Sequence, residues 1–257
     1  MSTSNRAPRV GAIVVAAGSG SRLGMGSKAL VELNGRTVLA WSLELFLQLD
    51  EVDQIVVPGP DGRLEAVRRE VQALQPRKPV LICAGGQTRQ QSVRAGLGEL
   101  VACDFVLVHD AARPLASPAL VRRVLAAAVE SGAAIPGLPP RDAVKRVEGG
   151  RLVESLDRTR LVLAQTPQGF AYQLFERAHF EAADAGVVGD DDGQLVAASG
   201  HPVTVVEGEP TNIKLTTSDD LPVLQAILRE REAAGAREAA AEAIRVVGTR
   251  AGRGRPR

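Results

Sequence analysis

The chain has 257 residues and a formal net charge of +1; 45% of the residues are hydrophobic and 24% are charged. This length can bury a full hydrophobic core, and so small a net charge argues against the overall positive field that draws proteins onto nucleic acid. The N-terminus lacks the apolar stretch of a signal peptide, and no apolar run approaches membrane-spanning length. We therefore expect a soluble, cytoplasmic protein that binds neither a membrane nor nucleic acid.

The first 140 residues alternate short apolar runs with longer amphipathic stretches. The apolar runs predict buried strands over residues 10–16, 54–57, 80–83, 105–109 and 133–136. The stretches between them predict helices over residues 37–49, 61–75, 91–101 and 118–131. Such alternation is typical of an α/β fold with a mostly parallel sheet and helices on both faces. Ligands of such sheets bind beyond the carboxyl ends of the strands.

The pattern changes after Pro139 and Pro140. Charged, β-like pieces on either side of Gly149 and Gly150 predict a β-hairpin arm, inserted over about residues 139–164, with little core of its own. An isolated hairpin is marginal in water, so we expect the arm to pack on another surface, such as a second subunit. Beyond the arm, the sequence predicts a helix over 171–185, strands over 203–206 and 213–215, and a closing helix over 221–232.

Residues 1–232 are interpreted as a single domain, and residues 233–257 as a C-terminal extension. The Ala/Glu/Arg run over 233–247 is compatible with a prolonged closing helix. The segment 249–257 holds four arginines and no acid, which predicts a disordered basic tail. The cysteines, Cys83 and Cys103, form neither a CxxC motif nor a metal-ligand pair, so we expect two buried, reduced thiols.

A glycine-rich loop follows the first strand, with the sequence AAGSGSRLG from Ala16 and a lysine, Lys28, shortly after it. Glycines allow a tight turn and bring backbone N–H groups close to phosphate oxygens, and Arg22 and Lys28 supply cations suited to a triphosphate. A dinucleotide-binding loop requires G-x-G-x-x-G, and here Gly24 comes one residue late. A Walker A loop requires G-x-x-x-x-G-K-[ST]. This segment has neither that glycine spacing nor a hydroxyl residue after Lys28. From this loop alone, its interpretation as a surface turn without a ligand stays open.

Five motifs together extend the argument beyond this loop. They are AAGSGSRLG with Lys28, GGQTRQQSV from Gly85, HDAARP from His109, DRTRLVLAQTPQGF from Asp157, and NIKLT from Asn212. With these motifs in this order, the chain resembles the 2-C-methyl-D-erythritol 4-phosphate cytidylyltransferase family over about residues 10–228. The resemblance implies a Rossmann-like nucleotidyltransferase fold and transfer of CMP from CTP to that polyol phosphate in non-mevalonate isoprenoid precursor synthesis. It also implies Mg²⁺ as cofactor and a homodimer formed through the arm.

The resemblance also assigns roles to residues of this chain. It implies nucleotide binding by Ala16, Ala17, Gly18, Gly20, Gly86, Gln87, Ser92, Asp110 and Ala111, with Asp110 also a candidate Mg²⁺ ligand. It implies catalytic roles for Arg22, Lys28, Arg158 and Lys214, and acceptor binding by Arg113, Arg158, Thr166 and Lys214. A phosphate monoester is already an anion at pH 7, so the reaction needs alignment and charge neutralisation rather than a general base. His109 is accordingly interpreted as a structural histidine.

The sequence departs from the family pattern where the acceptor is recognised. Ala143 stands where a threonine is usual, and Gly189 where a hydroxyl residue is common; the family also often has Pro in place of Val15. An acidic run, residues 190–192, is compatible with a wall near the polyol or with a solvated loop. The acceptor therefore stays open between 2-C-methyl-D-erythritol 4-phosphate and another polyol phosphate, such as ribitol 5-phosphate.

Two alternatives lie outside this class of enzyme. An NAD-dependent oxidoreductase would use Glu44 as its ribose-binding acid, but the spacing of the glycine loop counts against it. A nucleotide sensor without catalysis would have little need for the four separated cations that the motifs carry.

Overall fold

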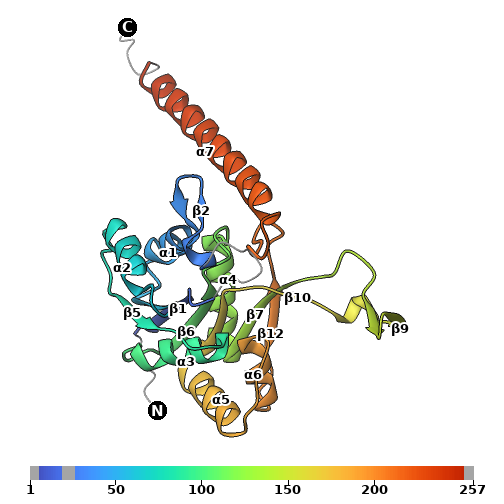
Figure 1. The fold of residues 1–257 in the computed structure, drawn as a ribbon. Coiled ribbons are helices and arrows are strands. Elements are labelled where there is room, and N and C mark those ends of the chain that lie inside the picture. Colours follow the sequence, from blue (N-terminus) through green and yellow to red (C-terminus); the bar gives the residue numbers. More distant parts are fainter. Residues whose placement is uncertain (1–5, 19–26, 252–257) are drawn as a thin grey trace.

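The computed structural model describes residues 6–18 and 27–251. In this part of the chain a central sheet carries helices on both faces, a hairpin arm projects from one side, and the last helix extends away from the body (Figure 1). This arrangement confirms the α/β architecture and the protruding arm expected from the sequence.

The central sheet has eight strands in the order β10-β7-β11-β6-β1-β4-β5, with β12 paired to β7. The strands are β1 (Val10–Val15), β4 (Gln54–Gly59), β5 (Val80–Ala84), β6 (Phe105–Asp110), β7 (Ala133–Leu138), β10 (Leu163–Ala164), β11 (Gln168–Ala171) and β12 (Thr204–Glu207). Strands β6, β1, β4 and β5 run parallel, so their carboxyl ends lie at one edge. Strand β11 lies antiparallel between β6 and β7, and the sequence analysis missed it.

The described residues contain seven α-helices, of which the first six cover the sheet. They are α1 (Val38–Leu47), α2 (Leu64–Ala73), α3 (Arg89–Glu99), α4 (Pro118–Ser131), α5 (Tyr172–Asp184), α6 (Asp192–Ala198) and α7 (Asp220–Ala251). Several begin at a side-chain cap: Thr37 caps α1, Ser117 caps α4, and Thr88 forms a capping box with Gln91 at the start of α3. None of these helices combines the length and the apolar character needed to cross a membrane.

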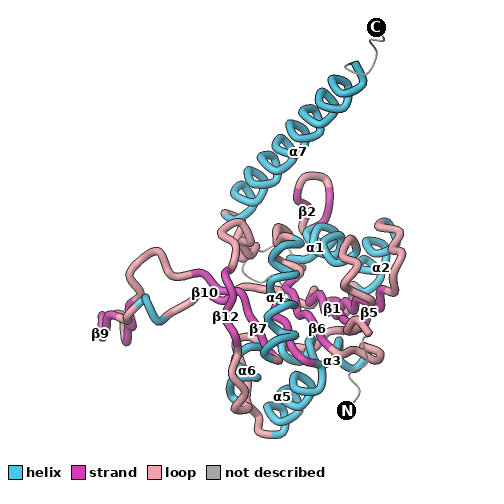
Figure 2. Tube along the Cα trace, turned by 180° about the vertical axis from the view of Figure 1, so that it is seen from behind, coloured by secondary structure: helices cyan, strands magenta, loops and turns pink. Residues whose placement is uncertain are grey.

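The core divides between the two faces of the sheet because alternate residues of a strand point to opposite sides. Ala12 and Val14 of β1 pack with buried side chains of α1, α2 and α4. Their neighbour Ile13 packs with buried side chains of α3, α5 and α6. Figure 2 shows the arrangement of these helices from behind. The buried sheet therefore holds the strand ends in fixed positions for a ligand site.

Smaller elements complete the fold. They are the pair β2 (Glu32–Leu33) and β3 (Arg36–Thr37), the arm hairpin β8 (Lys145–Glu148) and β9 (Arg151–Ser155), and the 3-10 turns η2 (Lys28–Leu30) and η3 (Arg158–Arg160). Every residue of β8 and β9 is exposed in the single chain. The arm therefore forms a hairpin without a core of its own, as the sequence predicted.

Three predictions need correction. The expected strand over 213–215 is a loop; its apolar pattern reflects burial, because Leu215 packs against Leu224 of α7 and its N–H donates to the carbonyl of Ala112. The closing helix continues to Ala251, so the first residues of the predicted disordered tail are helical; residues 252–257 lie outside the described part. Both cysteines are free, as expected, but they are half-buried rather than buried.

Candidate active site

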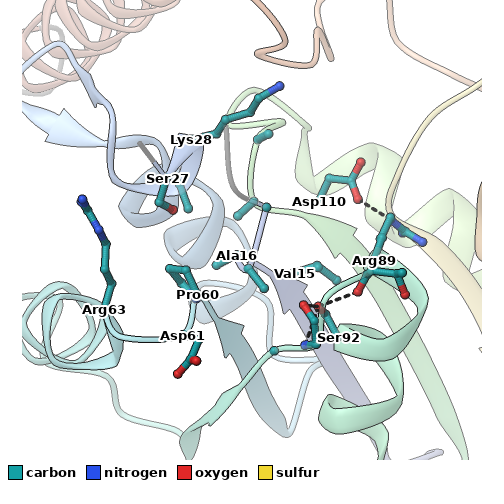
Figure 3. Close-up of a pocket in the computed structure, with 18 of the residues that line it drawn as sticks. Val15, Ala16, Ser27, Lys28, Pro60, Asp61, Arg63, Arg89, Ser92 and Asp110 are labelled. Carbon is teal, nitrogen blue, oxygen red and sulfur yellow. Dashed lines mark hydrogen bonds and ion pairs between the residues drawn. The ribbon is translucent and has the colours of Figure 1, made fainter. Parts of the chain in front are cut away.

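A cavity of about 730 Å³ lies where the parallel strands end (Figure 3). Its lining includes most of the predicted nucleotide-binding residues: Ala16, Ala17, Gly18, Gly86, Gln87, Ser92, Asp110 and Ala111. The predicted cations Lys28 and Lys214 also line it. Gly20 and Arg22 lie outside the described residues. The cavity is therefore where the parallel-sheet rule places a ligand, and it brings the central motifs together.

One wall of the cavity is a tight turn between β5 and α3. A Cβ atom on Gly85 would lie 2.3 Å from the Cβ of Ala17, so a larger residue would force the two loops apart. The Ser92 hydroxyl is buried, accepts from the N–H of Gly86 at 3.1 Å and donates to the carbonyl of Thr88 at 2.9 Å. Ser92 therefore shapes this turn and is not simply a hydroxyl offered to a ligand.

Lys28 reaches the cavity from η2. Its ammonium donates to the carbonyl of Thr216 at 3.0 Å. The segment around Thr216 is fixed in turn, because the carboxylate of Asp220, the first residue of α7, accepts from the N–H groups of Thr216 and Thr217. Lys28 is thus anchored to a segment that lies 188 residues away in the sequence.

A second set of charges meets at the end of β6. The ammonium of Lys214 lies 2.6 Å from Oδ2 of Asp110. Nε of Arg89 lies 2.9 Å from Oδ1 of the same carboxylate, and Figure 3 shows this contact. Burial alone would raise the pKa of Asp110, but Arg89 and Lys214 outweigh burial and hold this pKa well below its usual value. Asp110 is therefore a carboxylate whose two oxygens are both engaged by cations.

The side chains near the cavity that could bind a metal ion test the prediction of a Mg²⁺ site. Among residues 6–18 and 27–251, no cluster of three or more His, Cys, Asp or Glu side chains is placed to hold a metal ion. The carboxylates that line the cavity are Asp61 and Asp110. Magnesium is usually held by one or two carboxylates together with substrate phosphates and water. The residues present therefore fit a phosphate-bound Mg²⁺ and do not form an all-protein metal site.

His109 lies behind Asp110 and is fully buried. Burial lowers the pKa of His109 to about 4, so the imidazole is neutral at pH 7. Its Nε2 lies 3.1 Å from the carbonyl of Arg113 and must carry the proton, because a carbonyl only accepts. Its Nδ1 therefore accepts from the hydroxyl of Thr166 at 3.1 Å, and that hydroxyl accepts from the N–H of Asp110 at 3.0 Å. These contacts support the structural interpretation of His109.

Two predicted acceptor-binding residues lie behind the cavity and not on its lining. The Thr166 hydroxyl is buried and committed to His109 and Asp110, so it positions the end of β6. The guanidinium of Arg113 donates to the carbonyls of Asn212 and Ala164 at 2.8 and 3.3 Å. In this structure both residues support the site from outside.

Arg158 does not join the other cations within one chain. It lies in η3 on the exposed arm, is absent from the cavity lining, and donates to the carbonyl of Arg141 at 2.7 Å. Of the four predicted catalytic cations, Lys28 and Lys214 line the cavity of a single chain, Arg158 does not, and Arg22 lies outside the described residues. Among the described residues the acids near Arg158 have other partners, since Asp157 caps η3 and Glu154 pairs with Arg146.

The three residues of the acidic run have different surroundings: Asp190 is exposed in the loop before α6, as the solvated-loop interpretation predicted. Asp191 caps α6, accepting from the N–H of Gln194. Asp192 is buried and lies 2.6 Å from Nη1 of Arg89, so this residue is neither a solvated loop residue nor part of a wall of the cavity. The sequence analysis quoted Arg89 within a motif but gave it no role. Its position just after the glycine turn was the signal available in the sequence for a role of Arg89. The carboxylates that it contacts, Asp110 and Asp192, come from distant segments.

Comparison with known proteins places the chain in a family. The family model described as 2-C-methyl-D-erythritol 4-phosphate cytidylyltransferase matches residues 10–230. A protein of that name from Acidobacterium capsulatum is 41% identical over 235 residues, which cover 87% of this chain and 98% of the relative. A solved structure of the Thermus thermophilus protein of that name is 37% identical with a TM-score of 0.69, and the match covers 87% of this chain and all of that one.

Other relatives are longer. A bifunctional enzyme IspD/IspF from Anaeromyxobacter dehalogenans is 44% identical over 234 residues, covering 90% of this chain but 60% of the relative. The chain thus spans about 60% of the length of this relative. The residues that the family model matches include the sheet, the hairpin arm and the motifs that line the cavity. The chain belongs to the 2-C-methyl-D-erythritol 4-phosphate cytidylyltransferase family.

Proposed function

We propose that this protein transfers CMP from CTP to 2-C-methyl-D-erythritol 4-phosphate, giving 4-diphosphocytidyl-2-C-methyl-D-erythritol and pyrophosphate for isoprenoid precursor synthesis. The observation that carries the proposal is the cavity itself. It combines the narrow glycine turn at Gly85 with the ammonium groups of Lys28 and Lys214, all within motifs of the matched family. The turn suits a nucleotide, and the two cations suit the reacting phosphates.

The reaction requires two anions to approach each other. An oxygen of the acceptor phosphate attacks the α-phosphorus of CTP, and the bond to pyrophosphate breaks; no proton has to be removed from the attacking group at pH 7. Lys28 and Lys214 offset the negative charge and align the groups. An ammonium has three N–H donors, so Lys214 is able to keep Asp110 as a partner while it donates to the acceptor phosphate.

Magnesium is the proposed cofactor. When bound, it would neutralise charge on the triphosphate oxygens, with Asp110 and Asp61 as the nearby carboxylates of this chain. Asp110 contributes by holding Lys214 in place and by keeping a negative charge beside the cation-rich wall. Removing divalent cations with a chelator should abolish pyrophosphate release, and activity that survives chelation would contradict this part of the proposal.

We also propose that the protein is a homodimer in which the arm of one copy brings Arg158 to the cavity of the other. Within the described residues the arm exposes several large apolar side chains: Val147, Leu152, Val153, Val162 and Leu163. Arg158 belongs to the same arm and does not line the cavity of its own chain. Mixing Lys28→Ala and Arg158→Ala subunits should then restore activity, since one of the two shared sites in each mixed dimer would be intact. A mixture no more active than either variant would contradict the shared site.

The acceptor has one specific competitor. Ala143 and Gly189 both lack the hydroxyl that the sequence analysis expected for acceptor recognition, which favours ribitol 5-phosphate or a related polyol phosphate as a second candidate. The oxidoreductase alternative has no such support. Glu44 of α1 forms an ion pair with Arg36 of β3 at 2.8 Å, and Glu44 does not line the cavity.

The deciding experiment is a pyrophosphate-release assay with CTP, Mg²⁺ and a panel of polyol phosphates. We expect 2-C-methyl-D-erythritol 4-phosphate to give the highest kcat/KM. A higher value with ribitol 5-phosphate would replace the acceptor, and no release with any member of the panel would refute the function. We propose that the enzyme acts in the cytoplasm, where reducing conditions suit the free thiols of Cys83 and Cys103.

A further inference from the structure

A chain of polar and charged side chains runs from the interior of the protein to the cavity. From the inside outward it consists of His179, Asp192, Arg89, Asp110 and Lys214. His179 Nε2 lies 3.2 Å from Oδ1 of Asp192, and Arg89 Nη1 lies 2.6 Å from Oδ2 of Asp192. The outer half of the chain consists of the contacts that Arg89 and Lys214 make with the two oxygens of Asp110.

The innermost carboxylate is buried and the outermost cation is the most exposed. The side chain of Asp192 is 1% exposed, that of Asp110 is 10% exposed and that of Lys214 is 41% exposed, with Arg89 at 24% between the two carboxylates. Arg89 and Lys214 line the cavity, whereas Asp192 and His179 do not. Asp192 therefore reaches the reacting groups only through Arg89.

Arg89 depends on both of its carboxylates. It is the first residue of α3, where the helix dipole disfavours a cation. Burial alone would lower the pKa of Arg89, but Asp192 and Asp110 raise this pKa above its ordinary value, so the guanidinium stays charged. Because the guanidinium is a rigid plane, contacts at Nε and at Nη1 fix its orientation as well as its position. With Asp192 neutral, only the contact with Asp110 would remain.

We propose that Asp192 is a positioning residue for the transfer reaction. By holding Arg89 from the inside, it fixes the carboxylate of Asp110 and, through that carboxylate, the ammonium of Lys214 that meets the acceptor phosphate. His179 supports Asp192 from the far side, with its Nε2–H directed at Oδ1. The expected effect of Asp192 on catalysis rests on the proposed function. The role of Asp192 in holding Arg89 can be tested independently of that function.

The kinetic test uses Asp192→Asn, which keeps the shape of the side chain and removes its charge. We expect kcat with both substrates saturating to fall by about 10- to 100-fold, as for a reacting group displaced by a remote change. The KM for CTP should stay near the wild-type value, because the glycine turn at Gly85 is untouched. A folded Asp192→Asn protein with the kcat of wild type would overturn the inference.

Two control variants separate positioning from stability and from net charge. Val196→Ala removes buried methyl groups from the same helix without touching the ion pairs, so it should lower the melting temperature and leave kcat unchanged. Asp191→Asn makes the same charge change one residue away and keeps a side chain able to cap α6. Equal losses of kcat in Val196→Ala and Asp192→Asn, at equal losses of melting temperature, would reduce Asp192 to a structural residue.

The arrangement itself is visible in the ¹⁵N NMR signals of arginine side chains, with Arg89 assigned from Arg89→Lys. In the wild-type protein we expect separate, slowly exchanging guanidinium signals, since two carboxylates restrict rotation of the group. In Asp192→Asn these signals should merge. If the wild type showed no transferase activity, the proposed function would fail and this measurement would still decide the inference; signals unchanged in Asp192→Asn would overturn it.

Discussion

The wall of the cavity and the arm are built on opposite principles. The wall is held at three points: the glycine turn lies against Ala17, the buried Ser92 hydroxyl closes the turn, and buried, neutral His109 fixes the end of β6. The arm has two exposed strands and carries Arg158 away from the body. We infer that one copy of the chain preorganises this wall by itself, whereas the arm is placed by the proposed dimer. Variants on each side can break or sharpen this comparison.

The largest effect is expected at Lys28. Lys28→Ala should lower kcat by about 10²- to 10³-fold, the range found when a single donor to a developing negative charge is removed. Its melting temperature should stay close to that of wild type, because the side chain lines the cavity and does not belong to the hydrophobic core. Steady-state pyrophosphate release and a thermal melt test the two expectations. Near-normal turnover would remove Lys28 from the proposed mechanism.

The rigid wall should also show itself in the dependence of stability on pH. His109 has a folded pKa of about 4 against an ordinary value of 6.5, so the unfolded chain binds a proton first as the pH falls. This group therefore costs no stability above pH 6.5 and destabilises the fold progressively down to about pH 4, by about 3 kcal/mol in total. Denaturant titrations at several pH values should show that His109→Gln lacks this part of the slope. Equal slopes in the two proteins would contradict a neutral, buried His109.

Arg158→Ala tests the arm. We expect kcat/KM for the acceptor to fall by about 10- to 100-fold, as for loss of a charge-assisted contact that binds a phosphate. The KM for CTP and the unfolding free energy should change little, because Arg158 is exposed and contacts only a backbone carbonyl. Arg160→Ala, in the same 3-10 turn, is the matched control. Equal effects of the two substitutions would show that general charge on the arm matters, and not Arg158 in particular.

The smallest effect on the single chain is expected from Leu152→Asp in the arm. The side chain of Leu152 is 64% exposed, so the substitution should change the stability of one chain by less than about 0.5 kcal/mol. In the proposed dimer the same change places a charge on an apolar contact, and sedimentation should show dissociation. A dimer unaffected by Leu152→Asp would locate the contact elsewhere.

The sequence alone predicted most of the fold. Strands and helices with strong periodicity were identified because their pattern reports burial, and the caps at Thr37 and Ser117 mark where two helices begin. Strand β11 was missed because four residues with buried Gln168 and Gly169 do not look like an apolar run. The segment 213–215 was wrongly assigned as a strand because burial in a loop gives the same apolar pattern.

The site was predicted less completely, for a physical reason. Motifs identified residues that line the cavity, such as Lys28, Lys214 and Asp110. Partners behind them come from segments far apart in the sequence, and no local pattern reports these pairings. Asp192 shows the difficulty: within three consecutive acids it looks solvated, yet it is buried against Arg89.

One consequence follows from the anchor of Lys28. Its hydrogen bond to the carbonyl of Thr216 depends on a turn held by the carboxylate of Asp220, where α7 starts. A C-terminal deletion that removes Asp220 would therefore do more than shorten the molecule. It would remove the carboxylate that holds the turn at Thr216, and this turn positions Lys28, 188 residues earlier in the sequence. A truncation that removes only the C-terminal part of α7, in contrast, keeps Asp220 and its hydrogen bonds to this turn.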